Sequence, residues 1–205
     1  MNLMEVCSAM ILTLVLLQGA AAQETYNSRT LLRSDATFSE MWVPEVKLNS
    51  IQGRVGTLVG FYGGTLINRN LLLGITGGVN LGHPTVNYGY FGGIAQVIVN
   101  PDDLVHFSGQ LMVAYGTTKD YENPKSGMLD NFWNISGERF QVTEPGVNIE
   151  VNLRPGVTFV AGVSYRWVTG IDTNNEYVSV THVSSQDMSG INFNIGLKFA
   201  KKHKK

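Results

Sequence analysis

The sequence predicts an all-β fold, an eight-stranded antiparallel up-and-down transmembrane β-barrel. Apolar and polar residues alternate with period two in about eight segments, which is typical of strands whose two faces meet different surroundings. The clearest segments are about ten residues long, the length that a tilted strand needs to cross a bilayer. The longest connections fall at one end of such a sheet and the turns near Asn68, Asn100 and Pro155 at the other, which is the asymmetry of membrane barrels.

Residues 147–168 show the pattern most clearly, as two strands and a turn. Asn148, Glu150 and Asn152 alternate with apolar residues in the first strand, and Pro155-Gly156 then forms a turn, because proline presets φ and glycine tolerates a positive φ. The apolar face of this hairpin comprises Val147, Ile149, Val151, Leu153, Val157, Phe159, Ala161, Val163, Tyr165 and Trp167.

The other predicted strands repeat this logic in order along the chain. They cover residues 42–49, 55–67, 71–81, 86–99, 104–115 and 189–199. The second contains Gly63-Gly64, which indicates a bulge. The turn at Asn100-Pro101 separates the fourth from the fifth. Two long polar connections, residues 117–139 and 169–187, complete the predicted barrel.

The predicted domain organisation has four parts. Residues 1–22 are expected to be a signal peptide, because an apolar run precedes the small residues Ala20-Ala21-Ala22. Residues 23–40 form a loose N-terminal segment, residues 41–199 the barrel, and residues 200–205 a basic tail. Cys7 leaves with the signal peptide, so no disulfide and no thiol nucleophile are expected in the mature chain.

Composition argues against two classes of protein. The net charge is −1 and only 15% of residues are charged, whereas a nucleic-acid-binding protein needs a clustered basic surface. After the signal peptide no apolar run is long enough for a membrane helix. His83 and His182 stand without other ligands at metal-site spacing, so neither a metal nor a cofactor is predicted.

The large apolar face is predicted to point to lipid. The opposite face is rich in Gly, Ala, Ser, Thr, Asn and Gln, which suit the crowded interior of an eight-stranded barrel. Aromatic residues also gather near the strand ends, as expected of a membrane-interface girdle. These interface aromatics are Tyr88, Tyr90, Tyr115, Tyr165 and Trp167. The alternative with the apolar face inward is a secreted soluble barrel that binds an apolar ligand.

Several runs resemble a family of small outer-membrane β-barrel proteins, similar in architecture to the OmpA/OmpX-type barrels. These runs are LINRN from Leu66, NYGYFGG from Asn87, LVHFS from Leu104, EPGVNIEVNL from Glu144 and GVSYRWVTGID from Gly162. The resemblance covers residues 46–199 and implies a location in the bacterial outer membrane. The last strand departs from the common pattern, because six residues follow Phe199.

Polar residues on the inward face form a predicted lumen network: Glu150, Arg166, Lys198, His106 and Gln110. Charges inside a narrow barrel must pair, so this network is expected to close the lumen. The functional alternative is a proton or ion path.

His106 and Ser108 are two residues apart on one strand, which is similar to the His-x-Ser pair of outer-membrane lipid A deacylases. The following Gly109-Gln110 does not continue that motif, and the pair faces the lumen, away from lipid. No catalytic residue is therefore predicted, and a lipid-modifying enzyme remains the alternative.

The predicted function is an envelope structural or surface-interaction protein that acts through external loops. With a periplasmic N-terminus and an even number of strands, both long connections are external. Tyr121, Phe132 and Trp133 are the loop candidates for binding, because Tyr and Trp are frequent at interaction hot spots. The expected partners are outer-membrane lipids, the barrel-assembly machinery during insertion and an unknown extracellular or envelope partner. The chain is expected to be a monomer that binds no nucleic acid.

Overall fold

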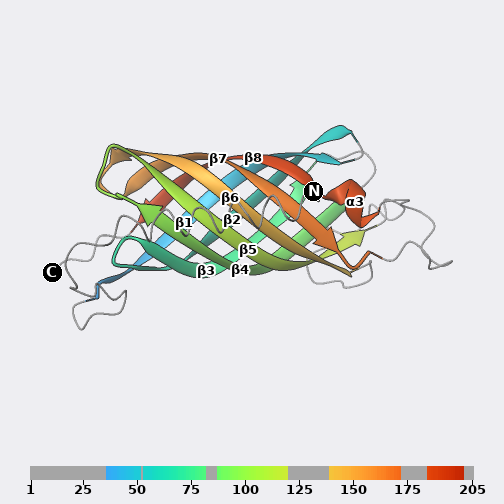
Figure 1. Cartoon of the computed structure of the whole chain (residues 1–205), viewed down its shortest axis with the longest axis horizontal. Coiled ribbons are helices and arrows are strands. Elements are labelled where there is room, and N and C mark those ends of the chain that lie inside the picture. The colour runs from blue at the N-terminus through green and yellow to red at the C-terminus, as the bar shows by residue number, and fades with distance from the viewer. Residues whose placement is uncertain (1–35, 52, 82–86, 120–138, 172–183, 201–205) are drawn as a thin grey trace, which may run out of the picture. The chain divides into compact units, whose positions relative to one another are not determined.

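Eight antiparallel strands form a closed barrel in the computed structural model, which confirms the predicted fold class (Figure 1). The structure describes residues 36–51, 53–81, 87–119, 139–171 and 184–200. The strands are β1 Phe38–Ile51, β2 Arg54–Ile67, β3 Leu71–Leu81, β4 Asn87–Val99, β5 Val105–Lys119, β6 Arg139–Arg154, β7 Val157–Thr169 and β8 Gly190–Ala200. Each strand pairs with the next one along the chain, and β8 pairs with β1 to close the sheet. Closure leaves no sheet edge unpaired.

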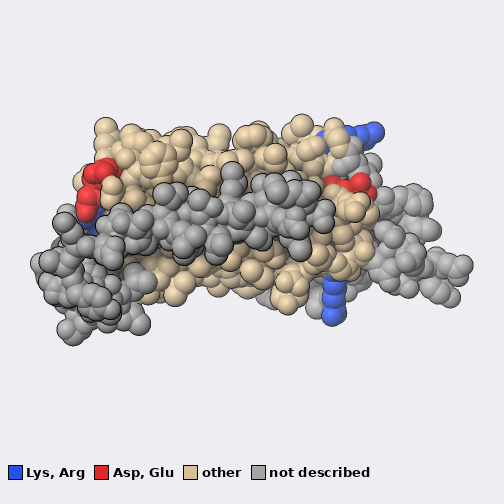
Figure 2. Space-filling view, in the orientation of Figure 1, with Lys and Arg blue, Asp and Glu red and all other residues tan. Residues whose placement is uncertain are grey.

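Side chains alternate between an apolar exterior and an interior that holds the buried polar and charged residues. On β8, Asn194 and Lys198 are buried, whereas Phe193 is 62% exposed and Ile195 is 56% exposed. Where grey atoms do not cover the side of the barrel in Figure 2, charged residues appear only near its two ends. An apolar outer surface between two charged rims is the distribution that a bilayer requires.

Strand β6 begins at Arg139, eight residues before the predicted start at residue 147. Pro145 and Gly146 interrupt the sequence pattern but not the strand. Pro145 pairs with Leu111 on β5, while the pairing with β7 is interrupted at Glu144 and Pro145. Proline has no N–H to donate, so the ladder with β7 is interrupted here, while the register with β5 continues through Pro145.

The other predicted boundaries differ less. β1 begins at Phe38, inside the segment predicted to be loose, and β8 ends at Ala200. The predicted signal peptide and residues 201–205 of the basic tail lie outside the described residues.

The predicted bulge at Gly63-Gly64 is absent from the ladder. The register of β2 with β1 and with β3 is continuous through both glycines. A Cβ atom on Gly63 would lie 2.6 Å from the ring of Trp42, which packs over this position on the outer surface. Gly63 is therefore needed for close packing beneath an aromatic ring.

The end of the barrel that carries the β2–β3, β4–β5 and β6–β7 connections is tightly built; we call it the turn end. Asn68 and Arg69 have φ values of 50° and 64°, which both central residues of a type I′ hairpin turn require. Gly156 has φ 82° directly after Pro155. Arg69 forms an ion pair with Asp102, so two of these turns are joined.

The opposite end, which we call the loop end, carries the short β1–β2 and β3–β4 connections and two long ones, β5–β6 and β7–β8. The β7–β8 connection contains α3, Ser185–Met188, whose N-cap Ser184 forms a capping box with Asp187. Two backbone N–H groups fasten α3 to the end of β7: Val168 N donates to Ser189 Oγ (2.9 Å) and Ile171 N to Ser185 Oγ (3.2 Å). No helix in the described ranges is long and apolar enough to cross a membrane.

Candidate functional site

The described part of the barrel interior contains three carboxylates and three fixed cations, none more than 5% exposed. They are Glu45, Glu144, Glu150, Lys47, Arg166 and Lys198. An isolated charge in such a place costs several kcal/mol, so these groups must be paired and hydrogen-bonded. They are arranged in two networks, one around Glu144 and one around Glu150.

Glu144 on β6 is the centre of the first network. Its Oε1 accepts hydrogen bonds from Lys47 Nζ (2.7 Å) and Ser164 Oγ (2.7 Å), and its Oε2 accepts one from Arg166 Nε (3.3 Å). Lys47 Nζ also lies 3.2 Å from Glu45 Oε1. One carboxylate thus joins β1, β6 and β7 through the interior.

Arg166 connects this network to two tyrosines on β4. Its Nη1 donates to Tyr88 Oη (2.6 Å), and its Cζ lies 5.4 Å from the centre of the Tyr88 ring and 5.9 Å from that of Tyr90. These distances permit cation–π attraction to both rings. A buried guanidinium is therefore held by a carboxylate, a hydroxyl and two aromatic faces.

The assignment of Tyr88 and Tyr90 to the membrane interface was wrong. They are only 4% and 2% exposed and point into the barrel. The sequence of β4 is ambiguous because large apolar residues occur on both faces: Ile94 is buried with the tyrosines, whereas Phe91 points outward. Inside the barrel the Tyr88 hydroxyl has a hydrogen-bond partner that lipid could not supply.

Glu150, also on β6, is the centre of the second network. Its Oε1 accepts from Ser108 Oγ (2.6 Å) and Gln96 Nε2 (3.1 Å). Its Oε2 lies 3.0 Å from His106 Nε2 and also binds Lys198 Nζ. Four side chains from three other strands therefore surround one carboxylate, which makes this network a cross-brace between β4, β5, β6 and β8.

His106 and Ser108 lack the geometry of a nucleophile and its base. The Ser108 hydroxyl donates to Glu150, and His106 Nε2 faces the other oxygen of the same carboxylate. His106 Nδ1 lies 3.2 Å from the carbonyl oxygen of Asp103, so the imidazole also holds the β4–β5 turn. In a His-x-Ser pair the imidazole would take the proton of the serine hydroxyl, whereas here Ser108 and His106 each contact Glu150 instead.

The structure brings the five predicted lumen residues to the inner face. Gln110 joins them through Asn148, whose Nδ2 donates to Gln110 Oε1 (3.1 Å). Sequence reasoning missed Glu45, Lys47 and Glu144. The signal was available, because Glu45 and Lys47 alternate with Val46, and Glu144 has the same parity as Glu150 on one strand.

The remaining predicted aromatics lie on the outer surface or outside the described residues. Tyr115 is 70% exposed, and the rings of Tyr165 and Trp167 contact edge to face with centres 5.2 Å apart. These three lie on the strand halves nearer the loop end. The loop candidates Tyr121, Phe132 and Trp133 fall within residues 120–138, which the structure does not describe.

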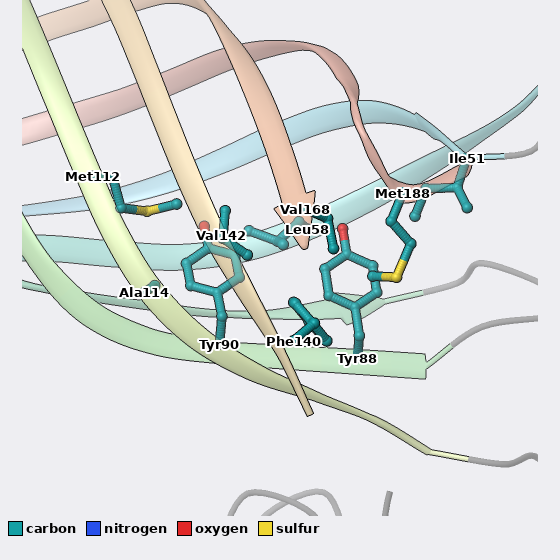
Figure 3. Packing of buried hydrophobic residues seen from close by; sticks show 10 residues of the cluster. All are labelled: Ile51, Leu58, Tyr88, Tyr90, Met112, Ala114, Phe140, Val142, Val168 and Met188. Atoms are coloured by element: carbon teal, nitrogen blue, oxygen red, sulfur yellow. The ribbon is translucent and has the colours of Figure 1, made fainter. Parts of the chain in front are cut away.

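Apolar side chains fill the interior toward each end. Figure 3 shows the loop-end cluster, in which Met188 from α3 packs among residues from the strands. Its members are Ile51, Leu58, Tyr88, Tyr90, Met112, Ala114, Phe140, Val142, Val168 and Met188. A second cluster, toward the turn end, comprises Met41, Val43, Tyr62, Leu66, Leu72, Ile94 and Ile98. No group of three or more potential metal ligands occurs among the described residues.

The barrel is similar to solved structures of outer-membrane proteins. The N-terminal β-barrel domain of OprF from Pseudomonas aeruginosa superposes with a TM-score of 0.54 at 10% identity, over 80% of this chain and 97% of that one. The protein has the fold of a small outer-membrane β-barrel. Neisserial surface protein A is also similar, with a TM-score of 0.48 and 14% identity over 80% of this chain and 97% of that one. No family model matches the sequence, and no curated protein matches it.

Proposed function

We propose that the protein is an integral barrel of the bacterial outer membrane that contributes to the envelope and binds a partner through the long connections at its loop end. The observation that carries this proposal is the asymmetry between the two ends. The turn end has only short connections, whereas the loop end carries both long ones beside the short β1–β2 and β3–β4 connections: 19 residues separate β5 from β6 and 20 separate β7 from β8. Long loops on a rigid barrel are common sites of recognition.

The distribution of apolar residues supports the membrane location. Large apolar side chains such as Phe193, Ile149 and Leu111 point outward, while the interior holds paired charges. A soluble barrel would expose its charges and bury these residues. The alternative of a secreted soluble barrel with an apolar ligand inside therefore has no support in this side-chain distribution.

The paired interior favours a closed barrel over a porin-like channel. Carboxylates and cations neutralise one another, and apolar clusters lie toward both ends. An eight-stranded barrel has an interior just wide enough for its own side chains. The lipid A deacylase-like alternative finds no specific support, since the hydroxyl of Ser108 and the imidazole of His106 are both engaged by Glu150.

Site-specific photo-cross-linking on intact cells tests the proposal. A photoreactive amino acid at position 132 or 133 should give an adduct with the partner, and the same amino acid at position 102 in the turn end should give none. A small epitope tag near Lys125 or Asn174 should be labelled on intact cells, and a tag replacing Asp102 should not. Labelling at Asp102 with none at Lys125 would reverse the topology and remove the basis of the proposal.

A further inference from the structure

We propose that the part of the barrel interior around the Glu144 network is a binding site for water molecules, formed by Glu45, Tyr90, Arg166, Asn192 and Asn194. The site lies inside the barrel, so it does not depend on the function proposed for the loops. Water held there would be part of the folded structure, bound by protein groups that are otherwise left incomplete.

Each of these residues has a buried polar atom that finds no hydrogen-bond partner among the described residues. The atoms are Glu45 Oε2, Tyr90 Oη, Arg166 Nη2, Asn192 Nδ2 and Asn194 Oδ1. All five residues are at most 4% exposed. Buried polar groups in folded proteins are nearly always paired with protein or with ordered water, because an unmade hydrogen bond is costly. Each of these five atoms therefore needs a partner, and ordered water can supply one.

The five residues border the same group, the Glu144 network. Glu45 contacts Lys47 on β1, and Arg166 contacts Glu144, which Lys47 also binds. Asn194 stands directly opposite Lys47 in the β1–β8 ladder, and Asn192 stands opposite the next inward residue, Asn49. Tyr90 is within reach from β4, because its ring centre lies 5.9 Å from the Arg166 guanidinium.

The chemistry of these atoms selects water over an ion. Glu45 Oε2 and Asn194 Oδ1 are acceptors, Arg166 Nη2 and Asn192 Nδ2 are donors, and the Tyr90 hydroxyl can do either. A cation would need acceptors only, and an anion would need donors only. Water both donates and accepts, and buried waters typically make two to four hydrogen bonds to such mixed sets.

Replacing Tyr90 with phenylalanine distinguishes a hydroxyl that binds water from a hydroxyl that has no hydrogen-bond partner. If Tyr90 Oη binds water, Tyr90→Phe removes a hydrogen bond and should lower the folding equilibrium constant in lipid vesicles about fivefold, the effect of one ordinary hydrogen bond. The matched control is Tyr88→Phe, which breaks the bond to Arg166 Nη1 and should destabilise at least as much. A Tyr90→Phe barrel that is as stable as the wild type, or more stable, would overturn the proposal. That result would mean that the hydroxyl has no partner, because deleting an unsatisfied buried hydroxyl removes its desolvation penalty.

Nuclear magnetic resonance gives a second, direct readout. Water cross-relaxation with the Asn192 side-chain amide should be detected in detergent micelles or nanodiscs. The Asn148 amide serves as a control, because its Nδ2 already donates to Ser108 Oγ and Gln110 Oε1 and its Oδ1 accepts from Asn194 Nδ2. A cross-peak at Asn192 that is at least threefold stronger than at Asn148 supports the site. Equal or absent cross-peaks at the two amides would refute it.

Discussion

Lys47 and Glu144 form a 2.7 Å ion pair through the interior, although 97 positions separate them in the sequence. They lie on β1 and β6, which are not neighbours in the sheet because β7 and β8 stand between them. Both side chains are almost fully buried. The pair thus ties together strands that no backbone ladder joins, and Arg166 and Ser164 add further ties at the same carboxylate.

We expect Lys47→Met to destabilise the barrel by about 3–5 kcal/mol, because it leaves Glu45 without its cation and Glu144 with one fewer, both buried. The measurement is urea titration of refolding into lipid vesicles. Val46→Met is the control. Val46 is next to Lys47 in the chain but its side chain points to lipid, so this substitution should cost far less stability. Equal losses in the two variants would mean that Lys47 does not brace the interior.

The lipid-facing surface gives a depth-dependent prediction. Val163 points outward near the middle of β7, between Val147 and Phe193 on the adjacent strands, whereas Val55 lies at the loop-end rim of β2. Val163→Arg should cost about 2–4 kcal/mol and Val55→Arg about 0–1 kcal/mol in bilayers, because the cost of a cation falls from the midplane to the interface. A larger loss at Val55 in the same refolding titration would contradict the placement of the bilayer.

α3 is predicted to depend on its one buried side chain. Met188→Ser should loosen the loop-end cluster and speed hydrogen exchange at the Val168 amide, which donates to Ser189 Oγ directly after α3. Gln186→Ser is the control on the same helix, because Gln186 is exposed. The same acceleration in both variants would show that the α3 backbone, and not the Met188 contact, holds this connection.

The His106–Ser108 pair is predicted to have no role in lipid chemistry. His106→Ala and Ser108→Ala should leave the lipid A acylation pattern of expressing cells unchanged, as mass spectrometry would show. Both variants should instead lose stability, by roughly 1–3 kcal/mol, because each removes a partner of the buried Glu150 carboxylate. Loss of one acyl chain that requires the wild-type residues would support the enzyme alternative.

Much of the fold could be predicted from local pattern. Residues 105–115 place His106, Ser108 and Gln110 on one face and Phe107, Val113 and Tyr115 on the other, as the structure does. The third strand was predicted with its observed bounds, Leu71–Leu81, because polar turn residues flank an unbroken alternation. Local alternation suffices here because successive side chains on a strand point to opposite faces whatever the strand pairs with.

Tertiary structure decided what alternation leaves open. Tyr88 and Tyr90 lie on a strand with large apolar residues on both faces, so their direction depends on the register of β4 with β3 and β5. Pro145 stays within β6 because β5 supplies a continuous partner on one side. Contacts across the interior, such as Lys47 with Glu144 and Lys198 with Glu150, depend on the tilt and stagger with which all eight strands close. Closure is a property of the whole sheet, and no single strand encodes it.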